Sequence, residues 1–311
     1  MQHSATAIGI DIGGTNLRVG RVSSGGEILD WVAEPITRDP RGLLDRIVEI
    51  CRRLDDETVA GIGIGVPGRV DARHRAVLSG GYIDLASASL AEDLEAALGK
   101  PVVIDNDCNM ALVAEIATGA AQGYDNVVMF TIGTGIGGAV VMEGKIVRGR
   151  ATAGQLGHLT VAQDGLACAC GRRGCVETTS SGTALRRLIR EAGLPTSTVV
   201  EDLFVAEAAG DPIARRILDT WASPLRTAID SMVAAADPDV IVLGGGLGGA
   251  AHRALSRAPA VSPWYQCGVV AAQLGDDAGV IGAAISALVE HMMEPEATAS
   301  APFRDVAGLG G

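Results

Sequence analysis

Apolar residues gather in three short runs near the start of the chain, at residues 7–12, 17–22 and 28–33. Turn residues separate the runs, with Gly13-Gly14 after the first and Ser23-Ser24-Gly25-Gly26 after the second. Short apolar runs bounded by glycine and serine are typical of strands joined by tight turns. The pattern predicts a three-stranded antiparallel meander.

Helix and strand patterns alternate after this meander. Apolar residues spaced by three or four positions predict helices, and short unbroken apolar runs predict buried strands. The predicted elements are a helix through Leu43, Ile47, Ile50 and Leu54, a strand at 59–66, a helix through Leu90, Leu94 and Leu98 that Gly99 closes, a strand at 101–104 and a helix at about 108–118. The first half of the chain therefore has the order β-β-β-α-β-α-β-α.

The same order begins again at residue 127. A strand at 127–132 leads through a glycine turn to residues 138–142, which we expect to pair with residues 146–147. Helices follow, and the longest starts at Asp211-Pro212, carries an apolar residue at every fourth position from Ile213 to Ile229 and is expected to kink at Pro224. Strands at 240–243 and 268–272 and a last helix at about 278–292 complete a duplicated α/β protein. Residues 294–311 have no periodicity and are expected to form a disordered tail.

Composition narrows the function classes. The chain has 311 residues with 48% hydrophobic content, enough for a sizeable core in two domains. A formal charge of −12 and nine aromatic residues provide neither the basic surface nor the stacking platform that nucleic-acid binding requires. Residues 1–6 do not resemble a signal peptide, and no segment is long and apolar enough to span a membrane. We therefore expect a cytoplasmic protein that binds neither nucleic acid nor membranes.

A cluster of metal-binding residue types lies between residues 158 and 177. His158, Cys168, Cys170 and Cys175 form the Cys3His set that tetrahedral structural zinc prefers. Gly171 and Gly174 let the loop bend around an ion. A disulfide framework is the alternative, but three clustered thiols leave one unpaired and nothing suggests secretion. The cluster predicts a zinc ion with a structural role, because four protein ligands leave no open coordination position.

Three glycine-rich turns are candidates for nucleotide binding. Their predicted contact residues are Asp11, Gly13, Gly14 and Thr15 in the first, Gly133, Thr134 and Gly135 in the second, and Gly244, Gly245 and Gly246 in the third. Glycine lets backbone N–H groups approach a phosphate, and the threonines add hydroxyl donors. A Rossmann motif is excluded because the second turn leads into a strand rather than a helix. We expect the turns to clamp a nucleotide between the two lobes, with Asp11 holding Mg²⁺ directly or through water.

A carboxylate pair follows the strand at 101–104. Asp105-Asn106-Asp107 stands where this strand passes into a helix, a position that projects side chains into the crevice between the lobes. If Asp107 faces the crevice, it can accept a hydroxyl proton while that oxygen attacks a γ-phosphate. The structural alternative, that Asp105 or Asp107 only caps the helix, stays open at this point.

These motifs together resemble the ROK family of actin-like sugar kinases, from about Ile8 to Leu288. The resemblance is carried by Asp-Ile-Gly-Gly-Thr at 11–15, Gly-Val-Pro-Gly at 65–68, Asp-Asn-Asp at 105–107, Gly-Thr-Gly-Ile-Gly-Gly at 133–138, Gly-Gln-Leu-Gly-His at 154–158 and Cys-Ala-Cys-Gly-Arg-Arg-Gly-Cys-Val-Glu at 168–177.

The resemblance implies an ATP-dependent sugar kinase with a two-lobed actin-like fold, that is, a ribonuclease H-like βββαβαβα unit in duplicate. It implies that the lobes comprise residues 1–118 with about 278–293, and residues 119–277 with the zinc loop. It further implies Asp107 as general base, zinc shaping the sugar loop through His158, and a homodimer. The implied sugar-binding residues are Gly68, Asn106, Asp107, Gln155, His158 and Glu177.

Two positions depart from the family pattern. Gln155 stands where the family usually has glutamate, and glutamine donates as well as accepts hydrogen bonds but carries no charge. The segment 79–84 lacks the Asn and Trp often found in that sugar-facing loop. Glucose, allose, N-acetylglucosamine and N-acetylmannosamine all stay open as substrates.

Two other functions compete with kinase activity. ROK transcriptional regulators share the sugar and zinc motifs but carry a winged helix-turn-helix ahead of the first strand, where this sequence has about seven residues. A sugar-binding protein without kinase activity is the other alternative, and it rests on Gln155 alone. Asp107 and both phosphate turns favour the kinase.

Overall fold

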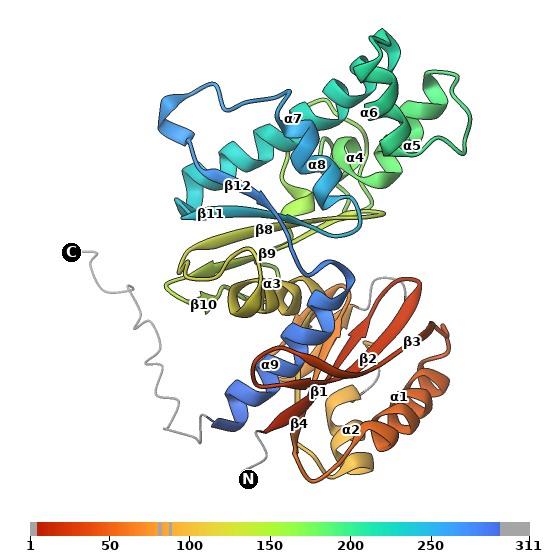
Figure 1. The fold of residues 1–311 in the computed structure, drawn as a ribbon, viewed down its shortest axis with the longest axis vertical. Helices are drawn as coiled ribbons and strands as arrows, with labels where there is room; N and C mark the ends of the chain where they lie inside the picture. Colours follow the sequence, from red (N-terminus) through yellow and green to blue (C-terminus); the bar gives the residue numbers. More distant parts are fainter. Residues whose placement is uncertain (1–4, 80–82, 87–88, 293–311) are drawn as a thin grey trace, which may run out of the picture.

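Two five-stranded sheets form the framework of the protein (Figure 1). The computed structural model describes residues 5–79, 83–86 and 89–292. In the first sheet the order is β3-β2-β1-β4-β7, where β1–β2 and β2–β3 are antiparallel and the other neighbours parallel. Its strands are β1 (Thr6–Ile12), β2 (Asn16–Ser23), β3 (Ile28–Pro35), β4 (Val59–Val66) and β7 (Val102–Asn106).

The second sheet repeats this arrangement with the order β10-β9-β8-β11-β12. Its antiparallel strands are β8, β9 and β10, and β11 and β12 add in parallel. The bounds are β8 (Val127–Ile132), β9 (Ile136–Met142), β10 (Lys145–Ile146), β11 (Val240–Gly244) and β12 (Gly268–Ala271). The predicted duplicated α/β fold is confirmed, including the meander that opens each half.

Helices cover both faces of both sheets. The described helices of four or more residues are α1 (Pro40–Leu54), α2 (Leu90–Leu98), α3 (Asp107–Thr118), α4 (Glu177–Ser180), α5 (Gly182–Glu191), α6 (Val200–Ala208), α7 (Pro212–Ala236), α8 (Gly248–Leu255) and α9 (Ala278–Met292). Successive strand residues point to opposite faces, so each sheet contributes to two cores. The outer face of the first sheet packs against α1 and α2, and that of the second against α4 to α8.

Most element boundaries follow local signals. Asp39 accepts a hydrogen bond from the Gly42 N–H at the start of α1, Asp211 caps α7 in the same way, and Gly99 ends α2 with a φ of 67°. The predicted bounds of β4 and α2 match the structure. The short hairpin of β5 (Arg69–Asp71) and β6 (Ala76–Ser79) was not predicted. Helix α7 runs without a break through Pro224.

The inner faces of the two sheets are filled by α3 and α9. Helix α3 packs on the inner face of the second sheet, and α9 packs on β1 and β4 of the first. Glycines make this packing possible, because a Cβ added at Gly9 would lie 1.9 Å from the Val280 carbonyl oxygen and one at Gly63 1.8 Å from that of Ala283. A Cβ at Gly282 would lie 1.7 Å from the Met110 carbonyl oxygen on α3. The two helices and the first sheet therefore touch backbone to backbone.

A buried carboxylate on α3 fixes the segments that cross between the halves. Glu115 is fully buried and accepts hydrogen bonds from the N–H groups of Ala120, Gln273 and Leu274 at 2.7 to 3.2 Å. Ala120 lies in the connection from α3 to β8, and the other two lie in the connection from β12 to α9. One side chain thus holds both connections at the same point.

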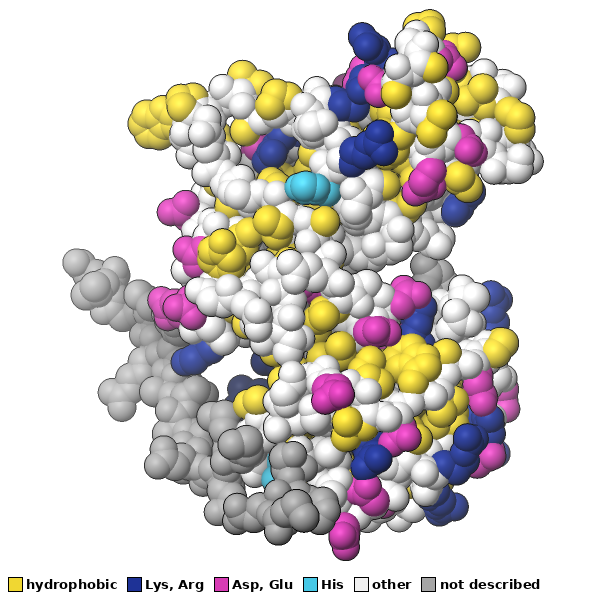
Figure 2. All heavy atoms as spheres, in the orientation of Figure 1, with side chains coloured by type: hydrophobic (Ala, Val, Ile, Leu, Met, Phe, Trp, Pro, Cys, Tyr) yellow, Lys and Arg dark blue, Asp and Glu magenta, His cyan; other side chains and the backbone are white. Residues whose placement is uncertain are grey.

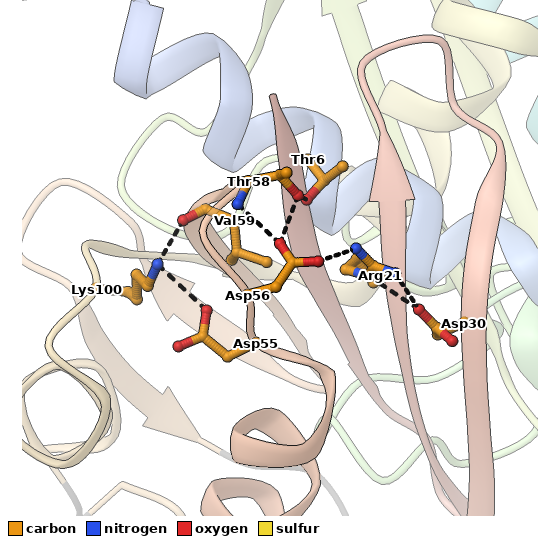
Figure 3. Close-up of polar contacts among 8 residues, drawn as sticks. All are labelled: Thr6, Arg21, Asp30, Asp55, Asp56, Thr58, Val59 and Lys100. Atoms are coloured by element: carbon orange, nitrogen blue, oxygen red, sulfur yellow. Dashed lines mark hydrogen bonds and ion pairs between the residues drawn. The ribbon is translucent and has the colours of Figure 1, made fainter. Parts of the chain in front are cut away.

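An ion-pair network links strands β3, β2, β1 and β4 at one end of the first sheet (Figure 3). Arg21 on β2 pairs with Asp30 on β3 and with Asp56 before β4. Asp56 also accepts hydrogen bonds from Thr58, which lower the pKa of its carboxyl group, and the Thr58 hydroxyl lies 2.9 Å from that of Thr6. These contacts tie the start of β4 to the start of β1, where the register shifts between Thr6 and Ala7.

The structure tests the expectations for membrane spans, for the tail and for the sugar-facing loop only within the described residues. Among the described residues, no helix combines the length and apolar character that a membrane span requires. The predicted tail at 294–311 and residues 80–82 of the sugar-facing loop lie outside the described residues.

We expect Gly63→Ala to destabilise the protein, because the added methyl group collides with the backbone of α9. Overpacking of this kind costs about 1 to 3 kcal/mol. Gly61→Ala on the same strand is the matched control, since its Cβ would have ordinary contacts no closer than 3.4 Å. Thermal unfolding of both variants measures the difference. Equal melting temperatures would show that α9 shifts freely and that the close contact is not a constraint.

Candidate active site

A cleft of about 590 Å³ opens between the two sheets and collects most of the predicted site residues. The surface is notched between the two halves in the space-filling view (Figure 2). The cleft is lined by Gly14, Thr15, Gly68, Asn106, Asp107, Gly133, Thr134, Gly135, Gln155, Glu177 and Gly245, among others. These residues come from seven separate segments of the chain, and the fold brings them to one place.

A smaller recess of about 140 Å³ adjoins the cleft. The two cavities share Asp107, Cys108, Thr131 and Gly245, and the recess adds Asp11 and Arg18. Of the residues predicted to bind sugar or nucleotide, four line neither cavity, namely Gly13, His158, Gly244 and Gly246. Asp107 therefore stands at the junction of the two spaces.

The strand-to-helix passage from β7 to α3 presents Asp107. Asn106 is the N-cap of α3, where its side-chain oxygen accepts from the Cys108 N–H at 2.9 Å and its amide nitrogen donates to the Gly68 carbonyl at 2.8 Å. Asp107 accepts from the same Cys108 N–H at 2.9 Å. Because Asn106 alone can cap the helix, the Asp107 carboxylate is not needed for that purpose.

The neighbouring carboxylate has a structural role instead. Asp105 is buried and accepts hydrogen bonds from the Asn106 N–H and from the Asn109 side chain on α3. Its second oxygen pairs with Nε of Arg148, which follows β10, at 2.7 Å. Asp105 thus ties the start of α3 to the second half of the chain.

Burial changes the protonation of Asp107. Removal from water, and then the negative charge of Asp11, raise the pKa of Asp107 to about 6, while the hydrogen bonds from Cys108 oppose the shift. A carboxyl group with this pKa is ionised at neutral pH and accepts a proton more readily than an ordinary aspartate. The site therefore contains one carboxylate suited to general-base chemistry.

The two predicted phosphate turns present free backbone donors. In the turn between β1 and β2, the Gly13 N–H donates to the Asn16 carbonyl, and the Gly133 N–H donates to the Gly135 carbonyl in the turn between β8 and β9. None of the hydrogen bonds between described residues uses the N–H groups of Gly14, Thr15, Thr134 or Gly135. Such grouped N–H donors form an anion-binding site.

Contacts from α4 and α5 hold the second turn in shape. Glu177 at the start of α4 accepts from the Ile136 N–H at 2.9 Å. The N–H groups of Gly182 and Thr183 at the start of α5 donate to the carbonyls of Gly133 and Thr134. These bonds occupy the carbonyl groups of the turn and leave its N–H donors available to a ligand. Glu177 therefore contacts the turn as well as lining the cleft.

The third glycine turn closes the recess at the end of β11. Gly245 has a φ of 77°, and a Cβ there would lie 2.7 Å from the Ile132 carbonyl oxygen. The Leu247 N–H donates to that same carbonyl at 2.9 Å. Glycine is required at this position both for its backbone conformation and for its close approach to β8.

Asp11, the predicted magnesium ligand, is paired in the structure. Arg18 on β2 donates to the Asp11 carboxylate at 3.1 Å and to Asp276 at 3.0 Å. Burial raises the pKa of Asp11, and the Arg18 guanidinium opposes this rise. The arginine thus favours the ionised carboxylate that a cation would need.

The predicted metal ligands lie together beside the cleft. One ligand atom from each of His158, Cys168, Cys170 and Cys175 falls within 4.8 Å of the others. Nδ1 of His158 lies 3.6 Å from Sγ of Cys168, and the sulfurs of Cys170 and Cys175 are also 3.6 Å apart. Bonds of 2.0 to 2.3 Å to a tetrahedral ion give separations of about 3.5 to 3.8 Å between ligand atoms. These two separations fit a tetrahedral metal ion, and the other two-atom distances within the cluster stay within 4.8 Å.

Comparison with known proteins agrees with this arrangement. The model of the ROK family matches residues 7–290. The chain belongs to the ROK family. A glucokinase from Thermotoga maritima is 34% identical over 89% of this chain and 95% of its own length. An N-acetyl-D-glucosamine kinase from Vibrio vulnificus is 31% identical over 89% of this chain and 97% of its own length.

A solved structure supports the same relationship. The ROK family glucokinase from Streptomyces griseus, in complex with glucose and AMPPNP, is similar with a TM-score of 0.75 and 31% identity. The match covers 90% of this chain and 98% of that one. The family and the two-sheet fold inferred from the sequence motifs are therefore confirmed.

Sequence reasoning did not find three arginines of the site. Arg18 contacts Asp11, Arg148 contacts Asp105, and Arg38 lines the cleft. The only local signal is that Arg18 shares strand β2 with the first turn and lies opposite Asp11 in the β1–β2 pairing. The other two arginines reach the site through contacts that only the folded chain creates.

Proposed function

We propose that this chain is an ATP-dependent sugar kinase that phosphorylates the 6-hydroxyl of a hexose or N-acylhexosamine, with Asp107 as general base. The kinase relatives matching about nine-tenths of the chain support the reaction class. The observation that carries the mechanism is the position of Asp107, which lines the same cleft as both phosphate turns. Direct transfer of a phosphoryl group to a hydroxyl group requires a base and a donor-binding site in the same cavity.

The residues divide the reaction between them. The N–H groups of Gly14, Thr15, Thr134 and Gly135 bind the donor phosphates, and Asp107 accepts the proton of the attacking hydroxyl. Bound Mg²⁺ would neutralise charge on these phosphates, and Asp11 is the residue that would hold it, directly or through water. Gly245 borders the nucleotide, and Gly68, Asn106, Gln155 and Glu177 border the sugar.

The Cys3His cluster is proposed to hold a structural zinc ion. Four ligands complete a tetrahedron, so the ion would stabilise the loop from residue 158 to residue 175 rather than act on substrate. His158 would bind the ion through Nδ1, and it would shape the sugar side of the cleft through Gln155, whose carbonyl accepts a hydrogen bond from the His158 N–H at 3.1 Å. The homodimer implied by the family resemblance stays a prediction.

Gln155 is proposed to select the sugar. Gln155 lines the cleft, and its side-chain amide forms no hydrogen bond with any described residue. A neutral amide can donate to a carbonyl or hydroxyl oxygen of the sugar, which a carboxylate cannot do. The alternatives of a sugar-responsive regulator and of a sugar-binding protein without activity are less supported, because the two curated relatives at 34% and 31% identity are kinases matched over 95% and 97% of their own length.

An ADP-release assay across glucose, allose, mannose, N-acetylglucosamine and N-acetylmannosamine tests the function directly. We expect one of these sugars to be turned over. Gln155→Glu should change the ratio of kcat/KM between these sugars by about tenfold, because a charge-assisted hydrogen bond differs from a neutral one by about 1 to 2 kcal/mol. The KM for ATP should change little. Activity with none of the sugars would contradict the proposed function. An unchanged preference in the variant would mean that Gln155 does not face the sugar.

Asp107→Asn is expected to lower kcat by about a hundredfold or more without lowering the melting temperature, because the variant removes the base but leaves the Asn106 cap. In the wild type, kcat/KM should fall as pH drops below about 6, where Asp107 becomes protonated. Asp105→Asn is the control, since it breaks the ion pair between the buried Asp105 and the half-exposed Arg148 and should lower stability. Near-normal kcat in folded Asp107→Asn would rule out the base.

Purified protein is expected to contain about one zinc per chain by elemental analysis. Cys175→Ser should lose the metal and lower the melting temperature, whereas Cys267→Ser, outside the cluster, should retain it. Metal-free wild-type protein prepared without chelator would contradict the assignment.

A further inference from the structure

Arg38 places a cation in the cleft that none of the roles described above includes. It lies in the connection between β3 and α1 and lines the cleft with Gly14, Thr15 and Asp107. The Ile36 N–H donates to the Thr15 carbonyl at 2.9 Å, which fastens this connection to the first phosphate turn. Asp39, the next residue, is the N-cap of α1. The backbone on both sides of Arg38 is therefore held beside the turn.

The charges around the cleft leave Arg38 available to a ligand. The other charged side chains that line it are the carboxylates Asp107 and Glu177. Arg18, on the other side of the first turn, is already paired with Asp11 and Asp276. Within the described part of the chain, no hydrogen bond or ion pair involves the Arg38 guanidinium, and the side chain is exposed.

We propose that Arg38 binds the phosphoryl group during its transfer and in the phosphorylated product. The inference rests on the proposed kinase function and adds a phosphoryl-binding residue to it. In the step, the bond between the γ-phosphorus and the ADP oxygen breaks, the bond to the sugar oxygen forms, and the hydroxyl proton passes to Asp107. Arg38 remains protonated throughout and neither gives nor takes a proton.

The chemistry of the transferred group favours a guanidinium here. Negative charge spreads over three oxygens of the phosphoryl group in the transition state, and a planar fork of N–H donors can contact two of them at once. Without Arg38, the carboxylates of Asp107 and Glu177 would face this charge with only backbone donors and a bound cation to balance it. Preorganised donors that meet developing charge contribute most to rate rather than to ground-state binding.

Arg38→Gln tests the proposal in the full-length protein, with Arg41→Gln as the matched control. Arg41 is also exposed, in the first turn of α1, but does not line the cleft. We expect Arg38→Gln to lower kcat by about ten- to hundredfold and to change the sugar KM by less than about threefold. Arg38→Lys should be intermediate, because an ammonium group keeps the charge but loses the fork. Arg41→Gln should match the wild type within about twofold.

Product inhibition gives a second readout. The probe is glucose 6-phosphate if glucose is a substrate, and otherwise the 6-phosphate of the preferred sugar. We expect its inhibition constant to rise by about tenfold in Arg38→Gln and to stay unchanged in Arg41→Gln. Wild-type kcat and unchanged product inhibition in Arg38→Gln would overturn the inference while leaving the kinase intact. An inactive wild type would instead overturn the proposed function on which the inference rests.

Discussion

The backbone contact between α9, α3 and the first sheet is the constraint on which the rest of the structure depends. Gly9, Gly63 and Gly282 have no room for a Cβ, so α9 lies closer to the sheet and to α3 than ordinary side chains allow. This contact holds α9, which follows the second sheet in the sequence, against the first half of the chain. It also fixes where α3 lies relative to α9 and the first sheet, and therefore where Asp107 enters the cleft.

Three carboxylates on or next to α3 show how the same residue type takes different roles by position. Asp105 and Glu115 are buried, and each accepts several hydrogen bonds. The bonds from Arg148 to Asp105 and from Gln273 and Leu274 to Glu115 link the two halves of the chain. A buried carboxylate without such partners would cost several kcal/mol. The hydrogen-bond partners of Asp107 all lie at the start of its own helix. Burial of its carboxyl group therefore raises its pKa, and the side chain does not link distant segments. Asp107 is therefore free to serve as the proposed base, because its neighbours provide the stability.

Sequence patterns predicted those parts of the fold that local signals define. The bounds of β4 and α2 could be read directly, because turn residues and Gly99 mark their ends. Helix α8 consists largely of glycine and alanine and offers no apolar period, so its bounds could not be predicted. Site residues could be predicted where a local sequence motif itself lines the cleft, as the glycine turns do. Glu115, Arg148 and Arg38 were missed because their roles come from partners far away in the sequence.

The two arginines beside the first phosphate turn illustrate what sequence alone cannot separate. Arg18 and Arg38 have the same chemistry and flank the same turn, but the fold pairs one with two aspartates and leaves the other facing the cleft. The paired arginine opposes the rise that burial imposes on the pKa of Asp11. The unpaired arginine adds positive charge where Asp107 and Glu177 would otherwise repel a phosphate. Charge in the cleft is therefore balanced on both sides of the turn, with one arginine acting through a carboxylate and the other on the phosphoryl group itself.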